Sequence, residues 1–291
     1  MKITICAIYK NENIYLREWV EHHKRLGFDK IFLYDNNPVD GEYPHQVIGD
    51  YITEGFVDVR NVRGYPFRPD GSSLSLQSTV YNQCRIEQQS NYKWMAFIDV
   101  DEFIIITPEE TQDIHAMFEK FGYDTCGFEQ VLMSWRNMSN SGELFYKPKP
   151  VMERFTEDAA IPSDKVAGIN NLWVKSMVRT DIPKNKGFIR GNEHAINGLY
   201  SCSSYGLWIP GNENGDLCQI SCSLHEKIYV AHYWAKSFME YISRRSIESL
   251  QEGRLYDWRV INGWDEKQQK ILDNFVEYVN NPEVIQNFER K

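Results

Sequence analysis

Two hydrophobic periodicities alternate along the first hundred residues. Short apolar runs rich in β-branched residues are typical of buried strands, and they fall at 3–9, 30–36, 56–62 and 92–100. Between them, apolar residues recur at helical spacing in the segments 13–28, 43–55 and 73–90. Gly27 and Gly55 stand where a glycine would end the first two of these helices. The alternation predicts parallel strands joined by helical crossovers, and therefore an α/β sheet.

The pattern changes after residue 104. The segment TPEE at 107–110 predicts a helix that extends to about Phe121, with Thr107 as N-cap, Pro108 at the first helical position and Glu110 completing a capping box. Residues 124–233 are expected to form short strands and loops, and the chain becomes helical again from 234. We therefore expect one α/β domain over 1–235, and a helical C-terminal extension over 236–291 that packs on it.

Composition and charge narrow the class of protein. The chain has 291 residues, of which 42% are hydrophobic and 14% aromatic, enough for a large core. The net charge of −9 argues against a nucleic-acid-binding protein, which would present a basic face. No stretch reaches the roughly 18 apolar residues of a membrane span, and the N-terminus does not resemble a secretory signal. These features predict a cytoplasmic protein whose six scattered cysteines are reduced thiols.

The segment WMAFIDVDEFI at 94–104 carries the main chemical signal. If the strand continues through it, Asp99 and Asp101 point to the same side, where two carboxylates about 4 Å apart repel by roughly 4 kcal/mol at an effective dielectric near 20. Either one carboxyl keeps its proton, or a Mg²⁺ or Mn²⁺ ion lies between them and leaves positions for a phosphate. The alternative is a solvated turn, in which Asp is common.

Other polar segments also follow predicted strands. KNEN and YDNN follow the first two, and ligands of α/β proteins bind at the carboxyl ends of strands. Together with QSTVYNQC, DVDEFI and HYWAKS, in this order and at this spacing, they resemble the GT-A glycosyltransferases of family 92 and the related family 2 type. The resemblance implies a Rossmann-like fold with a mixed central sheet flanked by helices. Residues 1–105 would form its nucleotide-binding half and 106–235 its acceptor-binding half.

The resemblance also implies an activity. A sugar would pass from a nucleotide-diphosphate donor to a glycan or lipid-linked saccharide, with inversion and with a divalent ion as cofactor. A bacterial enzyme of polysaccharide biosynthesis fits this pattern, and it could associate peripherally with a membrane. Two alternatives stay open: a non-catalytic nucleotide-sugar or glycan binder on the same fold, and a metal-dependent nucleotide-sugar hydrolase. The acceptor segment SWRNMSNSG departs from the family pattern, which leaves the acceptor undefined.

Site residues follow from the resemblance position by position. Asp99 and Asp101 correspond to the metal- and donor-binding pair, His232 to a third metal ligand and Lys236 to a phosphate contact, with Glu102 in support. The residues expected to contact the nucleotide or the donor sugar are Lys10, Asn11, Glu12, Asp35, Gln77 and Asn82. Plainer roles are open for several of them: Asn11 and Asp35 as caps, Gln77 and Asn82 as exposed helix residues, and His232 as an ordinary histidine.

An inverting transferase needs a base near the acceptor hydroxyl. Glu193, in the loop-rich segment RGNEHAI, is the first candidate, and Asp216 and Glu226 are rivals. An indole face can stack on a sugar ring, and the candidates for that role are Trp135, Trp173 and Trp208; core packing is the alternative for each.

Overall fold

A computed structural model describes residues 1–66, 75–159, 173–183, 189, 195–210, 226–243 and 270. The chain divides into two compact units. The first contains Met1–Arg136 and Asn171–His232, and the second contains Asn137–Asn170 and Tyr233–Lys291. This division differs from the predicted one, which assigned 137–170 to the first domain.

A mixed sheet is the centre of the first unit, in the order β3-β2-β1-β4-β7-β6-β10-β5, with β8 paired to β6 and β9 to β8. Strands β1 to β4 are parallel, whereas β7 is antiparallel to β4 and β10 to β5. The predicted α/β fold with a mixed sheet is therefore confirmed. The strands are β1 (Ile3–Tyr9), β2 (Lys30–Asp35), β3 (Val57–Asn61), β4 (Trp94–Phe97), β5 (Glu102–Ile106), β6 (Gln130–Asn137), β7 (Val174–Arg179), β8 (Ser201–Cys202), β9 (Trp208–Ile209) and β10 (Ile228–His232).

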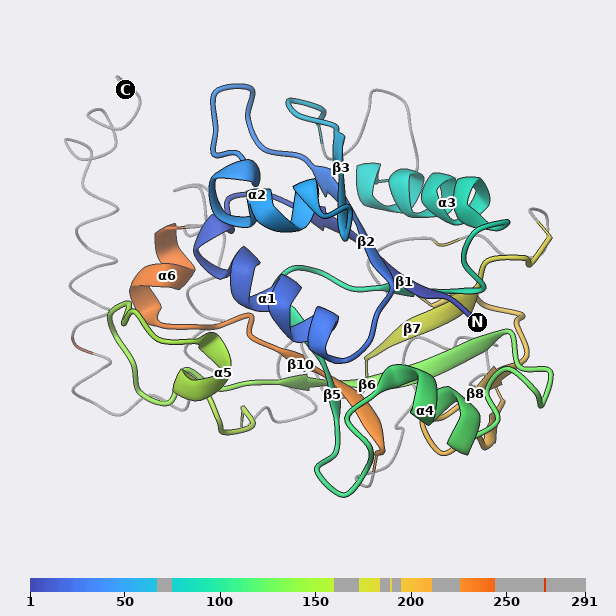
Figure 1. Cartoon of the computed structure of the whole chain (residues 1–291). Coiled ribbons are helices and arrows are strands. Elements are labelled where there is room, and N and C mark those ends of the chain that lie inside the picture. Colours follow the sequence, from blue (N-terminus) through green and yellow to red (C-terminus); the bar gives the residue numbers. More distant parts are fainter. Residues whose placement is uncertain are drawn as a thin grey trace. The chain divides into compact units, whose positions relative to one another are not determined.

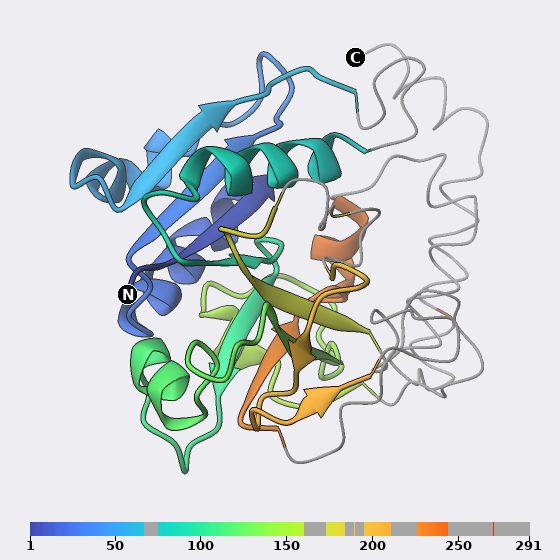
Figure 2. The same ribbon diagram turned by 90° about the vertical axis from the view of Figure 1, so that its right-hand side faces the viewer.

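Three helices connect the parallel strands, and their bounds agree with the sequence pattern. They are α1 (Asn13–Arg25), α2 (His45–Thr53) and α3 (Leu76–Gln88). Gly27 and Gly55 follow the first two with φ of 86° and 82°, the left-handed conformation that ends helices. Helices α1 and α2 lie on one face of the sheet and α3 on the other (Figures 1 and 2).

Two sequence predictions were wrong. The fourth strand ends at Phe97, and Asp99 and Asp101 lie in a turn between β4 and β5 instead of alternating along one strand. The helix predicted with Thr107 as N-cap and Pro108 as its first residue begins six residues later, as α4 (Ile114–Lys120), with the side chain of Asp113 accepting from the Ala116 N–H as the N-cap. The carboxylate of Glu110 does not complete a capping box; it is buried between Lys120 and Lys227.

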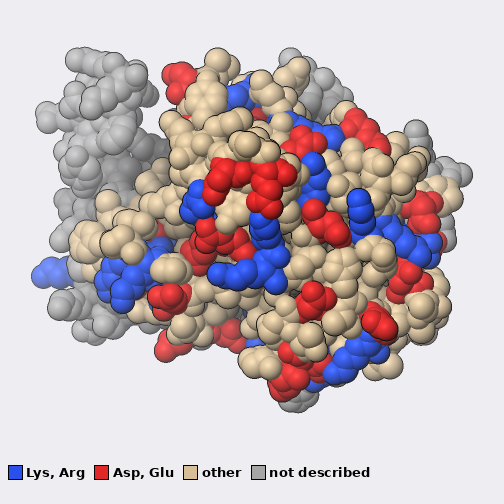
Figure 3. Space-filling model, viewed as in Figure 1, with Lys and Arg blue, Asp and Glu red and all other residues tan. Residues whose placement is uncertain are grey.

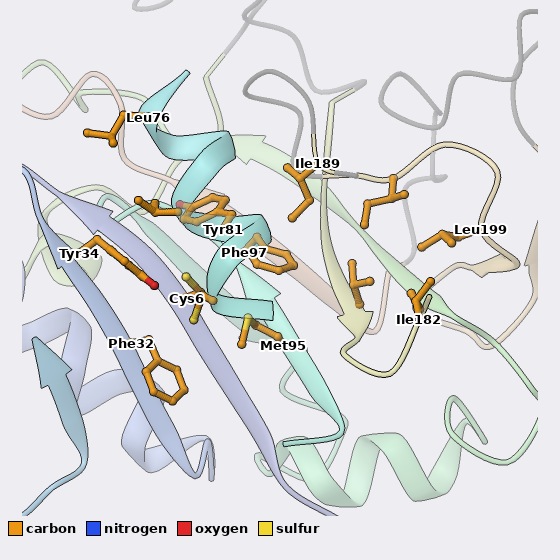
Figure 4. Packing of buried hydrophobic residues seen from close by; sticks show 14 residues of the cluster. Cys6, Phe32, Tyr34, Leu76, Tyr81, Met95, Phe97, Ile182, Ile189 and Leu199 are labelled. Carbon is orange, nitrogen blue, oxygen red and sulfur yellow. The ribbon is translucent and has the colours of Figure 1, made fainter. Parts of the chain in front are cut away.

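A hydrophobic cluster fixes α3 on the sheet (Figure 4). Met95 and Phe97 alternate with Trp94 and Ala96 along β4, so they face α3, where Phe97 packs against Tyr81 with ring centroids 5.2 Å apart. Burial of these rings anchors the helix beside the carboxyl end of β4.

Strand β5 lies at the end of the sheet, and α1 provides hydrogen-bond partners for its outer side. The Trp19 indole donates to the Glu102 carbonyl over 2.7 Å, and His22 Nε2 lies 2.7 Å from the Ile104 carbonyl. The Ile104 N–H donates to His23 Nε2 over 3.2 Å. Side chains of one helix therefore occupy the place of a neighbouring strand.

The outer surface of α1 and α2 carries interspersed charges (Figure 3). Arg17 pairs with Glu21 and Asp50, and Lys24 pairs with Glu54. Opposite charges balance one another on this surface, so it does not form a basic patch.

The second unit contains two short described helices, α5 (Val151–Arg154) and α6 (Phe238–Ser243). Arg154 donates to both carboxylate oxygens of Glu240, over 2.8 and 2.7 Å, and both side chains are buried. Such a bidentate pair links the two helices. Across the described residues of the chain, no helix is long and apolar enough to cross a membrane.

Candidate active site

An acidic turn forms at the carboxyl end of β4, beside the point where the order of the sheet reverses. Strands β2 and β3 extend to one side of β1, and β4 lies on the other side, which is the usual ligand position in doubly wound sheets. The Glu102 N–H donates to the Asp99 carbonyl, and the Asp99 N–H donates to Glu102 Oε2 over 2.9 Å. These two bonds close the turn and hold Asp99, Asp101 and Glu102 at the rim.

Glu102 is the buried centre of this turn, with none of its surface exposed. Its Oε1 accepts from the Trp135 indole over 2.7 Å and lies 3.0 Å from the Lys175 ammonium. Burial raises the pKa of Glu102, and the charge of Lys175 opposes the rise. All of these partners are donors, which is the hydrogen-bonding pattern of a carboxylate.

Lys175, on β7, is the cation of the turn. Its Nζ lies 3.1 Å from Asp99 Oδ2 and 3.0 Å from Glu102 Oε1, and its side chain is almost entirely buried. Burial works against its charge, but the carboxylates of Asp99 and Glu102 outweigh burial and raise the pKa of the ammonium. An internal lysine therefore balances part of the charge that the sequence analysis assigned to a bound ion.

Asp99 also contacts α3. Its Oδ1 accepts from Gln77 Nε2 over 2.6 Å and lies 3.4 Å from the Tyr81 hydroxyl. The side chain remains 32% exposed, so a ligand can still reach it. The structure thus brings Gln77 to the acidic turn, and its contact with a donor sugar stays a prediction.

Asp101 and His232 form a second pair at the rim. Asp101 Oδ1 lies 3.6 Å from His232 Nε2, and both side chains are largely buried. The Trp135 ring stacks on the imidazole with centroids 4.1 Å apart and an interplanar angle of 16°. Because Trp135 also donates to Glu102, one residue links the histidine to the buried centre of the turn.

The predicted metal site of Asp99, Asp101 and His232 stays a prediction. Within the described residues, no group of three or more His, Cys, Asp or Glu side chains converges to hold an ion. Asp99 is held by Lys175 and Gln77, whereas Asp101 lies beside His232. A carboxylate and an imidazole are both ligands that Mn²⁺ accepts, so Asp101 and His232 fit a divalent ion as a pair.

The residues expected beneath the nucleotide lie together after β1 and β2. Lys10 and Asn11 are exposed in the β1–α1 loop, and Glu12 is the buried N-cap residue of α1. Asn11 adopts a φ of 55°, unusual for a residue other than glycine, and its N–H donates to Asn37 Oδ1 over 2.8 Å. This bond joins the loops that follow the first two strands.

Asp35 is buried and has protein partners at both of its oxygens. Arg63 donates to Oδ2 over 2.8 Å, and Asn37 donates to Oδ1 from its side chain and its N–H. The guanidinium carbon of Arg63 lies 3.9 Å from the ring centroid of Tyr43, a half-exposed residue. A nucleotide would therefore meet Asp35 as part of a prearranged Arg63–Asp35–Asn37 group.

Asn82 and Lys236 are placed differently from the pattern that the resemblance implied. Asn82 is buried, and its amide donates to the Ile189 carbonyl and accepts from the Ile189 N–H, over 2.9 and 3.0 Å. These bonds tie residue 189 to α3 and correct the expectation that Asn82 faces the donor sugar. Lys236 belongs to the second unit, so its contact with a donor phosphate stays a prediction.

The acceptor base is not identified by the structure. Glu193 and Asp216 lie outside the described residues. Glu226 is hydrogen-bonded to Ser134, and burial raises its pKa to about 7. Ser134 and Trp135 are consecutive in β6 and point to opposite faces of the sheet, so the partner of Glu226 faces away from the side on which Trp135 stacks on His232. This placement does not favour Glu226 as the base.

The three tryptophans proposed as sugar platforms have different environments. Trp135 stacks on His232, and Trp208 is 58% exposed on β9. Trp173 is partly buried, and in the described part of the chain its indole N–H has no hydrogen-bond acceptor.

Sequence reasoning missed two residues of this region. Lys175 interrupts an apolar strand in the segment LWVKSMV, and a buried lysine requires a carboxylate partner. That interruption was a usable signal. The pairing of Arg63 with Asp35 carries no local signal, because Asp35 ends β2 and Arg63 follows β3.

Comparison with known proteins shows the family to which this chain belongs. A family model described as glycosyltransferase family 92 matches residues 1–181. The chain therefore belongs to glycosyltransferase family 92, which confirms the resemblance seen in the motifs.

Proteins similar to this chain align with it over only part of their own length. A family 92 protein of Ricinus communis is 29% identical over 114 residues, which are 39% of this chain and 18% of the relative. The galactan β-1,4-galactosyltransferase GALS2 of Arabidopsis thaliana is 31% identical over 121 residues, 41% of this chain and 22% of the relative. The chain thus spans less than a quarter of the length of these relatives. The crystal structure of S. aureus TarS 1-349 with UDP-GlcNAc aligns with a TM-score of 0.45 and 14% identity, covering 92% of this chain and 69% of that chain.

Proposed function

We propose that this protein transfers a sugar from a nucleotide-diphosphate donor to a glycan or a glycolipid precursor, with inversion at the anomeric carbon. The observation that carries the proposal is the acidic turn of a family 92 chain at the carboxyl end of β4, where Asp101 lies 3.6 Å from His232. A cytoplasmic location is part of the proposal.

A divalent ion is the proposed cofactor. Asp101 and His232 would hold it, and Mg²⁺ or Mn²⁺ bound by few protein groups takes its remaining ligands from substrate phosphates and water. When bound, the ion supplies positive charge that stabilises the diphosphate leaving group. Asp99 would accept hydrogen bonds from donor hydroxyl groups, since its carboxylate is already oriented by Lys175 and Gln77.

The donor nucleotide is proposed to bind along the loops that follow β1 and β2. Lys10 and Asn11 are exposed there, beside the Arg63–Asp35–Asn37 group. Two relatives are named galactan β-1,4-galactosyltransferases, so UDP-galactose is the first donor to test. Glu193 remains the proposed acceptor base.

A thermal-shift panel of nucleotide sugars, each with and without Mn²⁺, tests the proposal. The donor should raise the melting temperature only when Mn²⁺ is present, and Asp101→Asn should abolish that rise because it removes one of the two proposed ligands. An Asp101→Asn variant that shifts like the wild type would refute the assignment of the ion.

Product analysis separates the alternatives. A transferase acting on water releases free sugar and the nucleoside diphosphate, whereas a hydrolase that cuts between the phosphates releases a sugar phosphate. A non-catalytic binder shows the thermal shift but no turnover with any acceptor.

A further inference from the structure

The acidic turn contains a cation that comes from the protein itself. The Lys175 ammonium lies between Asp99 Oδ2 and Glu102 Oε1, at 3.1 and 3.0 Å. Its side chain is 4% exposed and that of Glu102 is 0% exposed, so water screens this contact weakly. The lysine extends from β7, whose register with β4 and β6 fixes its position.

The partners of these carboxylates compete with a metal ion. Gln77 donates to Asp99 over 2.6 Å, and Trp135 donates to Glu102 over 2.7 Å. Donors and metal ions use the same oxygen lone pairs, of which a carboxylate has about four, so these donors leave fewer positions for an ion on Asp99 and Glu102. An ion bound there would also approach the positive charge of Lys175, or leave that charge buried without its partners, which is strongly unfavourable.

We infer that Lys175 is a positioning residue that keeps Asp99 and Glu102 from binding a divalent ion, so that, among the described residues, the ligands to such an ion are Asp101 and His232. Two protein ligands hold Mn²⁺ weakly, and the diphosphate of the donor has to complete the coordination. The lysine thereby couples binding of the ion to binding of the donor. The inference rests on the proposed function for the identity of the donor, but its central claim concerns the protein without nucleotide.

Titration of the free protein with Mn²⁺ alone, followed by electron paramagnetic resonance, tests the claim. The wild type should bind weakly. In Lys175→Met the two carboxylates become available, and the ion should bind about tenfold more tightly or better, because ligand charge and number set the affinity of such sites. Lys175→Arg keeps the positive charge and should stay close to the wild type. Lys149→Met, at an exposed lysine, is the matched control and should titrate like the wild type.

A second variant tests the inference in case Lys175→Met alone does not fold. Lys175→Met combined with Glu102→Gln removes one positive and one negative charge, so no uncompensated charge is added to the core. Asp99 is still released from its lysine, and Mn²⁺ should again bind more tightly than in the wild type. If neither variant binds Mn²⁺ more tightly, or if the wild type already binds as tightly as they do, the inference is refuted.

The same titration distinguishes this inference from the proposed function. A wild type that transfers no sugar from any donor would refute the function, but it would leave the Mn²⁺ affinities of the variants as measured. Unchanged affinities together with normal transfer would refute the inference alone.

Discussion

Protonation of His23 should destabilise the first unit below neutral pH. The imidazole is completely buried; its Nδ1–H donates to the Trp19 carbonyl over 2.8 Å, and its Nε2 accepts from the Ile104 N–H. This arrangement requires the neutral ring, because a proton on Nε2 would face the Ile104 N–H. Burial is the main cause that lowers the pKa of His23 well below its usual 6.5, with His22 acting in the same direction.

The sign and size of the effect follow from the difference between folded and unfolded states. The unfolded chain takes up a proton near pH 6.5 and the folded chain does not, so stability is complete above pH 6.5 and falls as the pH is lowered. At pH 5 the difference of 1.5 units corresponds to about 2 kcal/mol. Burial also lowers the pKa of His22, which adds a contribution of the same sign.

Urea unfolding between pH 7.5 and 5.0, on the wild type and on His23→Gln, measures the effect. Glutamine can accept from the Ile104 N–H but does not titrate, so the variant should start less stable and lose about 2 kcal/mol less than the wild type over this range. All other titrating groups are common to the two proteins, so the difference between the two curves isolates His23. Parallel curves would refute the reasoning.

Two further variants test contacts outside the acidic turn. Asn82→Ala leaves both polar groups of the Ile189 backbone without their partner, and it should lower the free energy of unfolding in urea by about 2–4 kcal/mol. The control Gln83→Ala, at an exposed residue of α3, should lower it by less than about 0.5 kcal/mol. Equal losses in the two variants would contradict the role of Asn82. In the second unit, Arg154→Met leaves Glu240 buried without its cation, and it should lower the free energy of unfolding by about 3–5 kcal/mol. The control Lys147→Met removes a more exposed pair with Glu143 and should lower it by less than about 1 kcal/mol. A small loss for Arg154→Met would show that the pair is not important for stability.

The parallel half of the fold could be predicted because its signals are local. Apolar runs, helical spacing and the glycines at 27 and 55 each act within a few residues, and the structure confirms the elements they predicted. The helix start at Thr107 failed for a nonlocal reason. Glu110 pairs with Lys120 and Lys227, and this pairing favours a turn over the capping box.

The acidic turn shows the same limit. Its residues could be found from the sequence because Asp99, Asp101 and Glu102 interrupt an apolar run. Their partners could not, since Lys175 and His232 approach from strands more than seventy positions away and are brought there by the order of the sheet. The assumption of a continuous strand was also wrong, and with it the reason for placing one ion between the two aspartates.

The outer side of β5 has a consequence for how the molecule behaves at high concentration. An edge strand with unpaired backbone groups can pair with a strand of another molecule and start aggregation. Here three side chains of α1 already occupy the Glu102 carbonyl and both polar groups of the Ile104 backbone. Self-association through this edge of β5 would first require α1 to detach from the strand.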